Sequence, residues 1–302
     1  MSITRRTFIK SIVFGATGLT FSGCSTPVEV SKKPAKTNNK PAGTDNEKSN
    51  ATGEDQLTVT FLKVGKADAA VLVTPAATVM IDTGDADSSI DVVEGLEDLG
   101  IKRIDTLIVT HYDQDHVGGA AAVISEFDVG EVLCTYRSKE SLEVDAYDAA
   151  MDSAGLTEKT ITADMGLTAG PMNIEVLAPK QDEYDKDTSN NSSLVCLVTF
   201  GTNRLLFAGD IQEERIDELI AAKYDLTCNL LKVPHHGACE DNTDKLIEAT
   251  KPAYAVICCS KKNPEDEDVV DMLEDAGAEV FVTRKGPITA TLTPTSIAVD
   301  QE

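Results

Sequence analysis

The stretch that decides the fold is Thr110-His111-Tyr112-Asp113-Gln114-Asp115-His116-Val117-Gly118-Gly119, which holds two of the four histidines of this 302-residue chain. The other two, His235 and His236, are adjacent in Val-Pro-His-His-Gly. Imidazole nitrogens and carboxylate oxygens at this density are the donors of a transition-metal site. A loop that only caps a helix needs one aspartate, so we interpret the cluster as metal-binding.

The first motif predicts a strand, a metal-binding turn and a helix in succession. An apolar run typical of a buried strand covers residues 105–110 and ends where the polar cluster begins. Open α/β sheets place ligands at the carboxyl ends of their strands, which is where His111 stands. Gly118 and Gly119 then allow a close turn, and a helix is expected from Ala120 onward.

Apolar runs of strand length recur along the chain, and segments with a helical pattern lie between some of them. We expect strands over residues 57–64, 70–74, 78–82, 105–110, 131–134, 172–177, 194–200, 204–208, 230–233, 254–258, 279–282 and 289–293. We expect helices over residues 87–99, 119–127, 142–154, 213–222, 243–249 and 267–276. This order fits an α/β (α+β) fold with two mixed sheets covered outside by helices.

The first motif resembles the signature of the metallo-β-lactamase (MBL) family, whose general form is His-x-His-x-Asp-His. With Asp113 in third place it is similar to the MBL domain of the competence protein ComEC and its stand-alone exported relatives. Five further blocks in the same order extend the resemblance over residues 56–302: 64–69 (VGKADA), 80–84 (MIDTG), 190–195 (NNSSLV), 206–210 (LFAGD) and 231–237 (LKVPHHG). The resemblance implies a four-layer αββα sandwich with a metal site at one edge between the sheets.

The resemblance also implies two divalent metal ions. The first would bind His111 and Asp113, and Asp210 would bridge the two ions. The ligands implied for the second ion are Asp115, His116 and one member of the pair His235/His236. Because Asp113 replaces an imidazole, it makes the first position harder and shifts its preference from Zn²⁺ toward Mn²⁺ or Fe²⁺.

A further first-ion ligand of the family, a histidine in many members, has no counterpart between residues 117 and 234. Residues 190–192 stand in that region, so we expect a weaker first position. The Gly-His-Pro that often follows the strand near residue 258 in ComEC-like domains is also absent, since this chain has Lys262-Asn263-Pro264 there.

The chemistry of two close cations suits a phosphodiester, because they clamp both the attacking and the leaving oxygens. Asp115 or the non-ligating member of His235/His236 would carry the proton to the leaving group. The leading hypothesis is therefore a metal-dependent phosphodiesterase or nuclease that acts on nucleic acid or on an envelope phosphodiester. Two alternatives stay open: a lactam, lactone or thioester hydrolase of the same fold, and a catalytically degenerate surface binding module.

The amino terminus predicts export. Residues 4–10 (TRRTFIK) resemble a twin-arginine signal, and residues 20–24 (TFSGC) resemble a lipobox that ends at Cys24. The apolar segment over residues 11–23 has about 13 residues, fewer than the ~20 of a spanning helix. We predict a lipoprotein signal over residues 1–24 that tethers the chain to the outer face of the cytoplasmic membrane. An uncleaved membrane anchor is the alternative.

Residues 25–55 are rich in Lys, Pro, Thr, Asn and Gly and predict a flexible linker, which leaves a domain over residues 56–302. The chain carries 27 Lys+Arg against 51 Asp+Glu, a formal net charge of −24. Surfaces that bind nucleic acid use basic patches, and no basic cluster stands out here. Local cations near loop ends would have to help the metals: Lys66, Lys232, Lys261, Lys262, Arg284 and Lys285. The sequence identifies no protein partner.

The cysteines do not predict a thiolate zinc site, because no CxxC spacing occurs. Cys228 and Cys239 flank the His-His pair and could form a disulfide in an oxidising compartment. The others, apart from Cys24, lie in apolar runs and are expected to be small buried hydrophobic residues.

Overall fold

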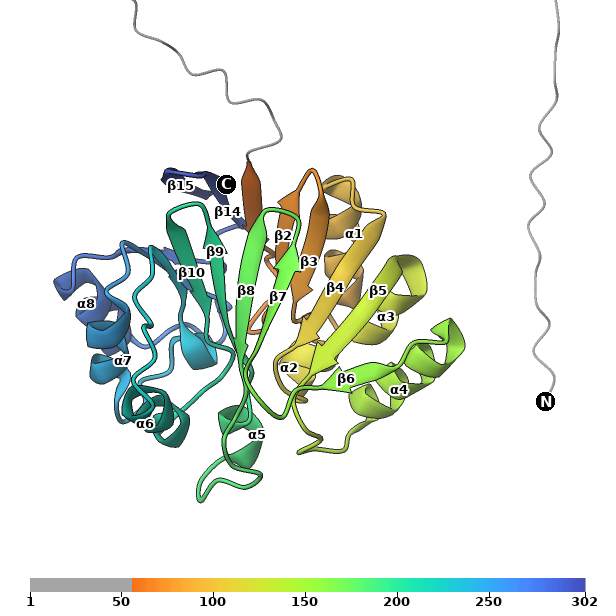
Figure 1. The fold of residues 1–302 in the computed structure, drawn as a ribbon, viewed down its shortest axis with the longest axis horizontal. Coiled ribbons are helices and arrows are strands. Elements are labelled where there is room, and N and C mark those ends of the chain that lie inside the picture. Colours follow the sequence, from red (N-terminus) through yellow and green to blue (C-terminus); the bar gives the residue numbers. More distant parts are fainter. Residues whose placement is uncertain (1–55, 302) are drawn as a thin grey trace, which may run out of the picture. The chain divides into compact units, whose positions relative to one another are not determined.

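The computed structural model describes residues 56–301. The signal expected over residues 1–24 and the linker expected over residues 25–55 lie outside the described residues. The described chain forms two β-sheets, and helices pack on the outer side of each (Figure 1).

Over residues 56–301 the first sheet contains eight strands in the order β15-β14-β1-β2-β3-β4-β5-β6. They are β1 (Leu57–Phe61), β2 (Ala70–Thr74), β3 (Ala77–Ile81), β4 (Arg103–Val109), β5 (Asp128–Cys134), β6 (Glu158–Thr160), β14 (Ile288–Thr293) and β15 (Ser296–Gln301). Neighbours are antiparallel from β15 to β3 and parallel from β3 to β6. The last two strands of the chain thus complete the N-terminal sheet, where Leu292 pairs with Leu57.

The second sheet has seven strands within the described range, in the order β13-β12-β11-β10-β9-β8-β7. They are β7 (Met165–Ala169), β8 (Met172–Leu177), β9 (Val195–Phe200), β10 (Asn203–Phe207), β11 (Leu230–Lys232), β12 (Tyr254–Ile257) and β13 (Glu279–Val282). Neighbours are parallel from β13 to β10 and antiparallel from β10 to β7. Both sheets therefore combine an antiparallel part with a parallel part, as the sequence predicts.

Helical segments connect the strands. They are α1 (Ser89–Asp98), α2 (Gln114–Val117), α3 (Ala120–Glu126), α4 (Leu142–Ala154), α5 (Thr188–Asn191), α6 (Glu213–Ala221), α7 (Thr243–Thr250), α8 (Glu267–Asp275) and the 3₁₀ turn η2 (Pro234–Gly237). None of the helices in residues 56–301 is both long and apolar enough to cross a membrane.

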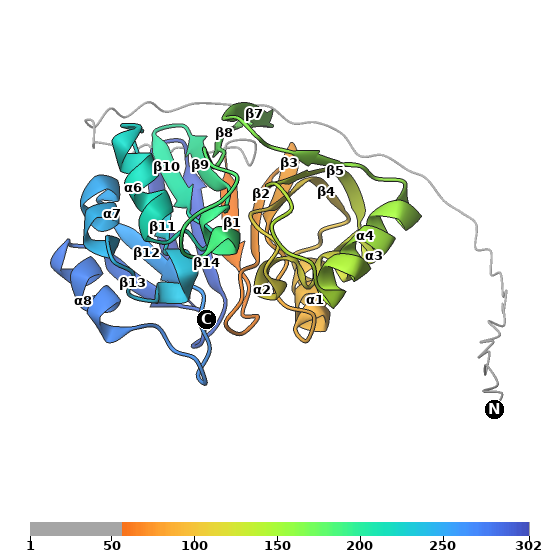
Figure 2. The same ribbon diagram turned by 90° about the horizontal axis from the view of Figure 1, so that it is seen from below.

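Buried apolar side chains of the described residues gather in three cores, which account for the layers. One core lies between the sheets, where Phe61 of the first sheet stacks on Phe207 of the second with ring centroids 5.8 Å apart. A second core joins the first sheet to α1, α3 and α4, and a third joins the second sheet to α6, α7 and α8 (Figure 2). The predicted four-layer αββα sandwich is confirmed.

The two glycines of the first motif are required by a close approach of the backbone. Gly118 and Gly119 both have ordinary helical angles, with φ of −60° and −82°. A Cβ atom on Gly119 would lie 2.0 Å from the carbonyl oxygen of Thr83. The amide of Thr83 in turn donates to the carbonyl of His116 at 2.8 Å. The motif is therefore held tightly against the end of β3.

The cysteines of the described residues are all free thiols. Cys228 is buried and Cys239 is exposed, so the two are not joined in a disulfide. Cys134, Cys196, Cys258 and Cys259 are buried in the cores, as expected.

Candidate metal centre

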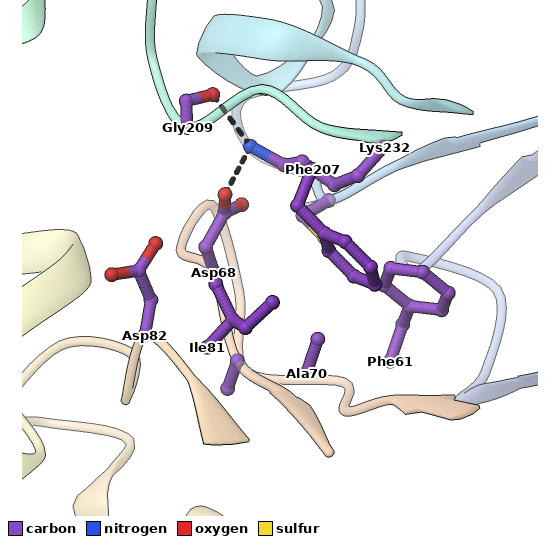
Figure 3. A pocket seen from close by; sticks show the side chains of 10 residues that line it. Phe61, Asp68, Ala70, Ile81, Asp82, Phe207, Gly209 and Lys232 are labelled. Carbon is purple, nitrogen blue, oxygen red and sulfur yellow. Dashed lines mark hydrogen bonds and ion pairs between the residues drawn. The ribbon is translucent and has the colours of Figure 1, made fainter. Parts of the chain in front are cut away.

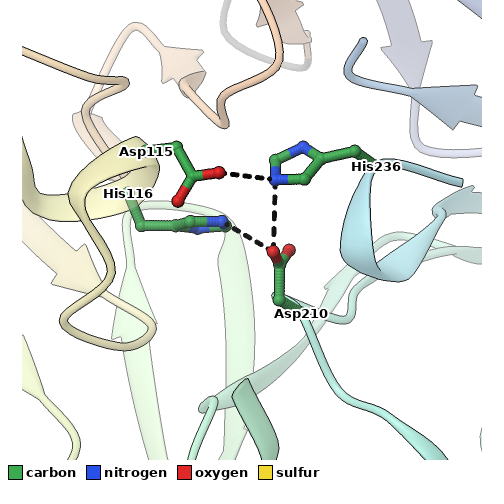
Figure 4. Close-up of side chains that lie close together, drawn as sticks. All are labelled: Asp115, His116, Asp210 and His236. Carbon is green, nitrogen blue, oxygen red and sulfur yellow. Dashed lines mark hydrogen bonds and ion pairs between the residues drawn. The ribbon is translucent and has the colours of Figure 1, made fainter. Parts of the chain in front are cut away.

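Four side chains converge at the carboxyl ends of strands from both sheets (Figure 4). Asp115 and His116 lie on α2 beyond β4, Asp210 follows β10, and His236 follows β11. His236 Nε2 lies 3.1 Å from Asp115 Oδ2 and 3.1 Å from Asp210 Oδ2, and His116 Nε2 lies 3.2 Å from the same Asp210 oxygen. The four ligand atoms lie within 4.8 Å of one another, so one ion can reach them all.

The backbone of η2 decides which histidine joins this group. His235 and His236 have φ values of 48° and 55°, the left-handed region that costs a non-glycine residue about 1–2 kcal/mol. The turn sends the two rings in different directions: His236 is buried and faces Asp210, whereas His235 Nδ1 lies 2.6 Å from Glu240 Oε1. The sequence leaves the choice within this pair open, and the geometry places His236 in the cluster.

Neighbouring groups fix the orientation of both cluster imidazoles. His116 Nδ1 lies 2.8 Å from Asp82 Oδ2, and the other oxygen of Asp82 accepts from the amide of Thr110 at 2.7 Å. His236 Nδ1 lies 3.0 Å from the carbonyl oxygen of Cys258 and donates to it. Each ring therefore turns its Nε2 toward Asp210, the arrangement that holds metal-ligating histidines.

The cluster leaves buried polar atoms unsatisfied within the described part of the chain. Three such atoms have no hydrogen-bond partner among residues 56–301: His111 Nε2, His116 Nε2 and Asp210 Oδ1. His116 Nε2 lies within ion-pair distance of Asp210 Oδ2, but the two atoms do not form a hydrogen bond. Buried atoms of this kind are costly unless something else satisfies them. One divalent ion at the four-residue cluster would reach His116 and Asp210, and a second ion would be needed to satisfy His111, so this is a candidate dinuclear metal site.

The electrostatics of the cluster also favour a cation. Burial lowers the pKa of His236, but the carboxylates of Asp210 and Asp115 raise it to about 9. Burial lowers the pKa of His116 as well, and its carboxylate neighbours, with Asp210 first, hold it well above the usual value. Protons thus occupy both rings in the absence of a metal, and metal binding displaces them.

Beneath the cluster lies a buried ion pair that the sequence does not predict. The Nζ of Lys232 contacts a carboxylate oxygen of Asp68 and donates to the carbonyl oxygen of Gly209 at 3.0 Å (Figure 3). The same Nζ lies 3.5 Å from Asp210 Oδ1. Asp68, Gly209 and Lys232 line a small cavity of about 10 Å³, room for roughly one water molecule. The expectation that Lys232 grips substrate is wrong, because only 3% of its side chain is exposed.

The remaining predicted ligands lie beside the cluster. His111 is fully buried with its ring centroid 4.1 Å from that of His116, and its Nδ1 lies 3.2 Å from the hydroxyls of Thr110 and Ser193. Burial lowers the pKa of His111, so it is neutral, the form that binds metals. The carboxylate of Asp113 instead contacts Lys139 and Ser189.

Some residues of the site were not assigned a role from sequence. Asp68 and Asp82 lie within the quoted blocks 64–69 and 80–84, and they form a second group with His116. We interpret this group as support for the His116 ring, because the Lys232 ammonium already occupies the space beside Asp68. Arg284, expected to be a free cation, donates to both oxygens of Glu265.

The comparisons with known proteins agree with this fold and site. A family model described as the metallo-beta-lactamase superfamily matches residues 62–261. ComE operon protein 3 of Bacillus subtilis is 29% identical over 165 residues, which are 54% of this chain and 21% of that protein. Competence protein ComA of Neisseria gonorrhoeae is 27% identical over 212 residues, 69% of this chain and 28% of that protein. The match therefore spans about a quarter of the length of these relatives.

Solved structures share the fold at low sequence identity. The metallo-beta-lactamase fold protein YhfI of Bacillus subtilis superposes with a TM-score of 0.52 at 10% identity, over 81% of this chain and all of that one. CmlA, a diiron beta-hydroxylase of Streptomyces venezuelae, gives a TM-score of 0.50 at 17% identity, over 80% of this chain and 55% of that one. With the family model covering most of the described domain, the chain belongs to the metallo-beta-lactamase superfamily.

Proposed function

We propose that this protein is a metal-dependent phosphodiesterase of the ComEC-like type. The observation that carries the proposal is the convergence of Asp115, His116, Asp210 and His236 around buried atoms that lack hydrogen-bond partners. The similarity to a relative that is named as a competence protein, ComA of Neisseria gonorrhoeae, supports a nucleic-acid substrate. An envelope phosphodiester has the same reactive group and is the second substrate to test.

A divalent ion bound at these four side chains supplies Lewis acidity to a phosphoryl oxygen and to the attacking water. The chain itself orients the ligands, because Asp82 and the Cys258 carbonyl fix the two imidazoles. Asp115 keeps a quarter of its side chain exposed and so remains accessible from solvent. It is one candidate to accept a proton.

His235 is the other candidate for proton transfer. It is part-exposed, with 21% of its side chain accessible, and Glu240 holds its Nδ1. Its Nε2 lies 3.5 Å from the side-chain amide nitrogen, Nδ2, of Asn190. A histidine with one nitrogen fixed by a carboxylate can carry a proton on the other, and this arrangement suits donation to a leaving oxygen. We assign His236 as ligand and His235 as proton carrier.

The test is hydrolysis by the purified chain after removal of metal with a chelator and addition of Mn²⁺ or Zn²⁺. Single-stranded DNA, a chromogenic bis-aryl phosphate and a chromogenic cephalosporin are offered in parallel. We expect the added ion to restore cleavage of the two phosphodiesters. Loss of a group that only orients a ligand costs about 10- to 100-fold, so Asp210→Ala should reduce the rate by more than about 100-fold.

Two outcomes contradict the proposal. Turnover of the cephalosporin without cleavage of either phosphate would identify a lactam hydrolase. A folded protein, checked by circular dichroism, that cleaves nothing with either ion would instead favour a binding module of the same fold.

The proposal includes a location. Arg5, Arg6 and Cys24 support export and attachment of a lipid at the outer face of the cytoplasmic membrane. In cell fractionation we expect Cys24→Ser to move the exported chain from the membrane to the soluble fraction. Cys239→Ser, which changes an exposed free thiol, is the matched control and should stay with the membrane. Unchanged membrane association of Cys24→Ser would point to an uncleaved anchor.

A further inference from the structure

The carboxylate of Asp113 has partners other than the cluster. Its Oδ1 lies 3.0 Å from the Nζ of Lys139 and accepts a hydrogen bond from the hydroxyl of Ser189. Lys139 lies in the segment between β5 and α4, and Ser189 lies on α5. Asp113 is 20% exposed and Lys139 is 45% exposed, so the pair stands at the solvent boundary of the site.

The two implied ligands of the first ion therefore differ in whether they already have a partner. His111 is fully buried and its Nε2 has no hydrogen-bond partner among the described residues, so this nitrogen is available to a cation. Asp113 already has a cation within salt-bridge distance. In residues 56–301 the side chains close enough to share an ion form two sets, and neither set includes His111 or Asp113. The first position is not assembled, whereas the second one is.

We propose that the ammonium group of Lys139 competes with a divalent ion for Asp113, so that the chain binds one ion tightly and a second ion weakly. The tight ion lies at the four-residue cluster. The weak ion binds at His111 and Asp113 once Lys139 moves away. This inference rests on the proposed function, because it assigns the order in which the metal centre fills.

Competition of this kind couples metal binding to substrate. Lys139 is exposed enough to turn outward and pair with a phosphate, and Asp113 then becomes available to a cation. Because coupling between two binding events is reciprocal, a phosphodiester should tighten the second ion, and that ion should tighten the phosphodiester. The chain would complete its metal centre at a lower concentration of the ion when an anionic substrate is present.

The test measures metal content and does not depend on turnover. The metal-free chain is titrated with Mn²⁺ by calorimetry, and retained Mn²⁺ is counted by mass spectrometry after dialysis. We expect one ion to be retained by the natural chain and two by Lys139→Met. Since a partly exposed ion pair is worth up to about fivefold in an equilibrium, the second ion should bind up to about fivefold more tightly to Lys139→Met.

Two control variants test whether the effect requires the loss of the positive charge and whether it requires the position of Lys139. Lys139→Arg keeps the cation and should behave as the natural chain does. Lys180→Met removes a comparably exposed lysine, 40% accessible, that pairs with Asp164, and should also leave both affinities unchanged. Dimethyl phosphate, a diester that resists hydrolysis, should tighten the second Mn²⁺ in the natural chain and have no such effect in Lys139→Met.

Equal affinity for the second ion in the natural chain and in Lys139→Met would overturn the inference. If the natural chain retained no ion at all, both the inference and the proposed function would fail. One retained ion in the natural chain and two in Lys139→Met, without hydrolysis of any phosphodiester, would support the inference and reject the function.

Discussion

Replacing His236 with alanine is expected to abolish tight binding of Mn²⁺ or Zn²⁺, whereas His235→Ala is expected to leave that binding intact. His236 Nε2 lies 3.1 Å from carboxylate oxygens of both Asp115 and Asp210, whereas the Nδ1 of His235 faces Glu240. Because groups that only orient a ligand contribute about 10- to 100-fold, the loss of a direct ligand should weaken binding by more than about 100-fold.

The two variants are matched in composition, since they remove the same side chain from neighbouring positions. Metal content after dialysis and calorimetric titration measure the contrast, and circular dichroism checks that both variants fold. In the hydrolysis assay His235→Ala should lose rate while it keeps its ion. A His235→Ala protein that loses the ion while His236→Ala keeps it would reverse the assignment.

Lys232→Met is expected to destabilise the metal-free protein by roughly 3–5 kcal/mol, the cost of removing one partner of a buried ion pair while the other stays buried. The ammonium of Lys232 contacts Asp68 and lies 3.5 Å from Asp210 Oδ1, with both partners almost fully buried. Burial lowers the pKa of Lys232, but the two carboxylates outweigh it and raise the pKa, so the lysine is charged. Methionine preserves the shape and removes the ammonium group that pairs with the buried carboxylate of Asp68 and lies near Asp210.

Urea denaturation of the metal-free chain measures the change in the free energy of unfolding. Lys245→Met removes an exposed lysine that lies 3.4 Å from Asp217, and it should cost no more than about 1 kcal/mol. Saturating Mn²⁺ should restore part of the loss, because an ion that binds only the folded state stabilises it. A Lys232→Met protein within about 1 kcal/mol of the natural chain would show that the pair is dispensable for stability.

The layers and the centre of each sheet can be predicted from sequence because buried strands consist of apolar runs. The strands not predicted are β6, β7 and β15, and each lies at the edge of its sheet. In β15 the burial pattern alternates between exposed and half-buried residues, and in β6 no residue is buried. Edge strands of this kind have one neighbour and little apolar surface, so their pattern does not stand out from that of loops.

The site is predictable to the level of motifs, and its details depend on the backbone. No property of the sequence distinguishes His235 from His236, and the positive φ angles of both residues separate them. Asp82 is visible as a strand-end carboxylate, but its hydrogen bond to His116 requires the fold. The contact between Asp113 and Lys139 joins segments that are distant in sequence and have no shared pattern.

The pairing of β1 with β14 has a consequence for the way the protein is made. The first strand of the domain remains without one of its neighbours until residues 288–293 have left the ribosome. The backbone N–H and C=O groups on both edges of β1 need hydrogen-bond partners, and the inner face of β1 packs in the core between the sheets. Contacts this distant in sequence form slowly, because a long loop must close first. The sheet that contains β1 can therefore close only after residues 288–293 have been made, and a chain released before that point exposes an unpaired apolar strand.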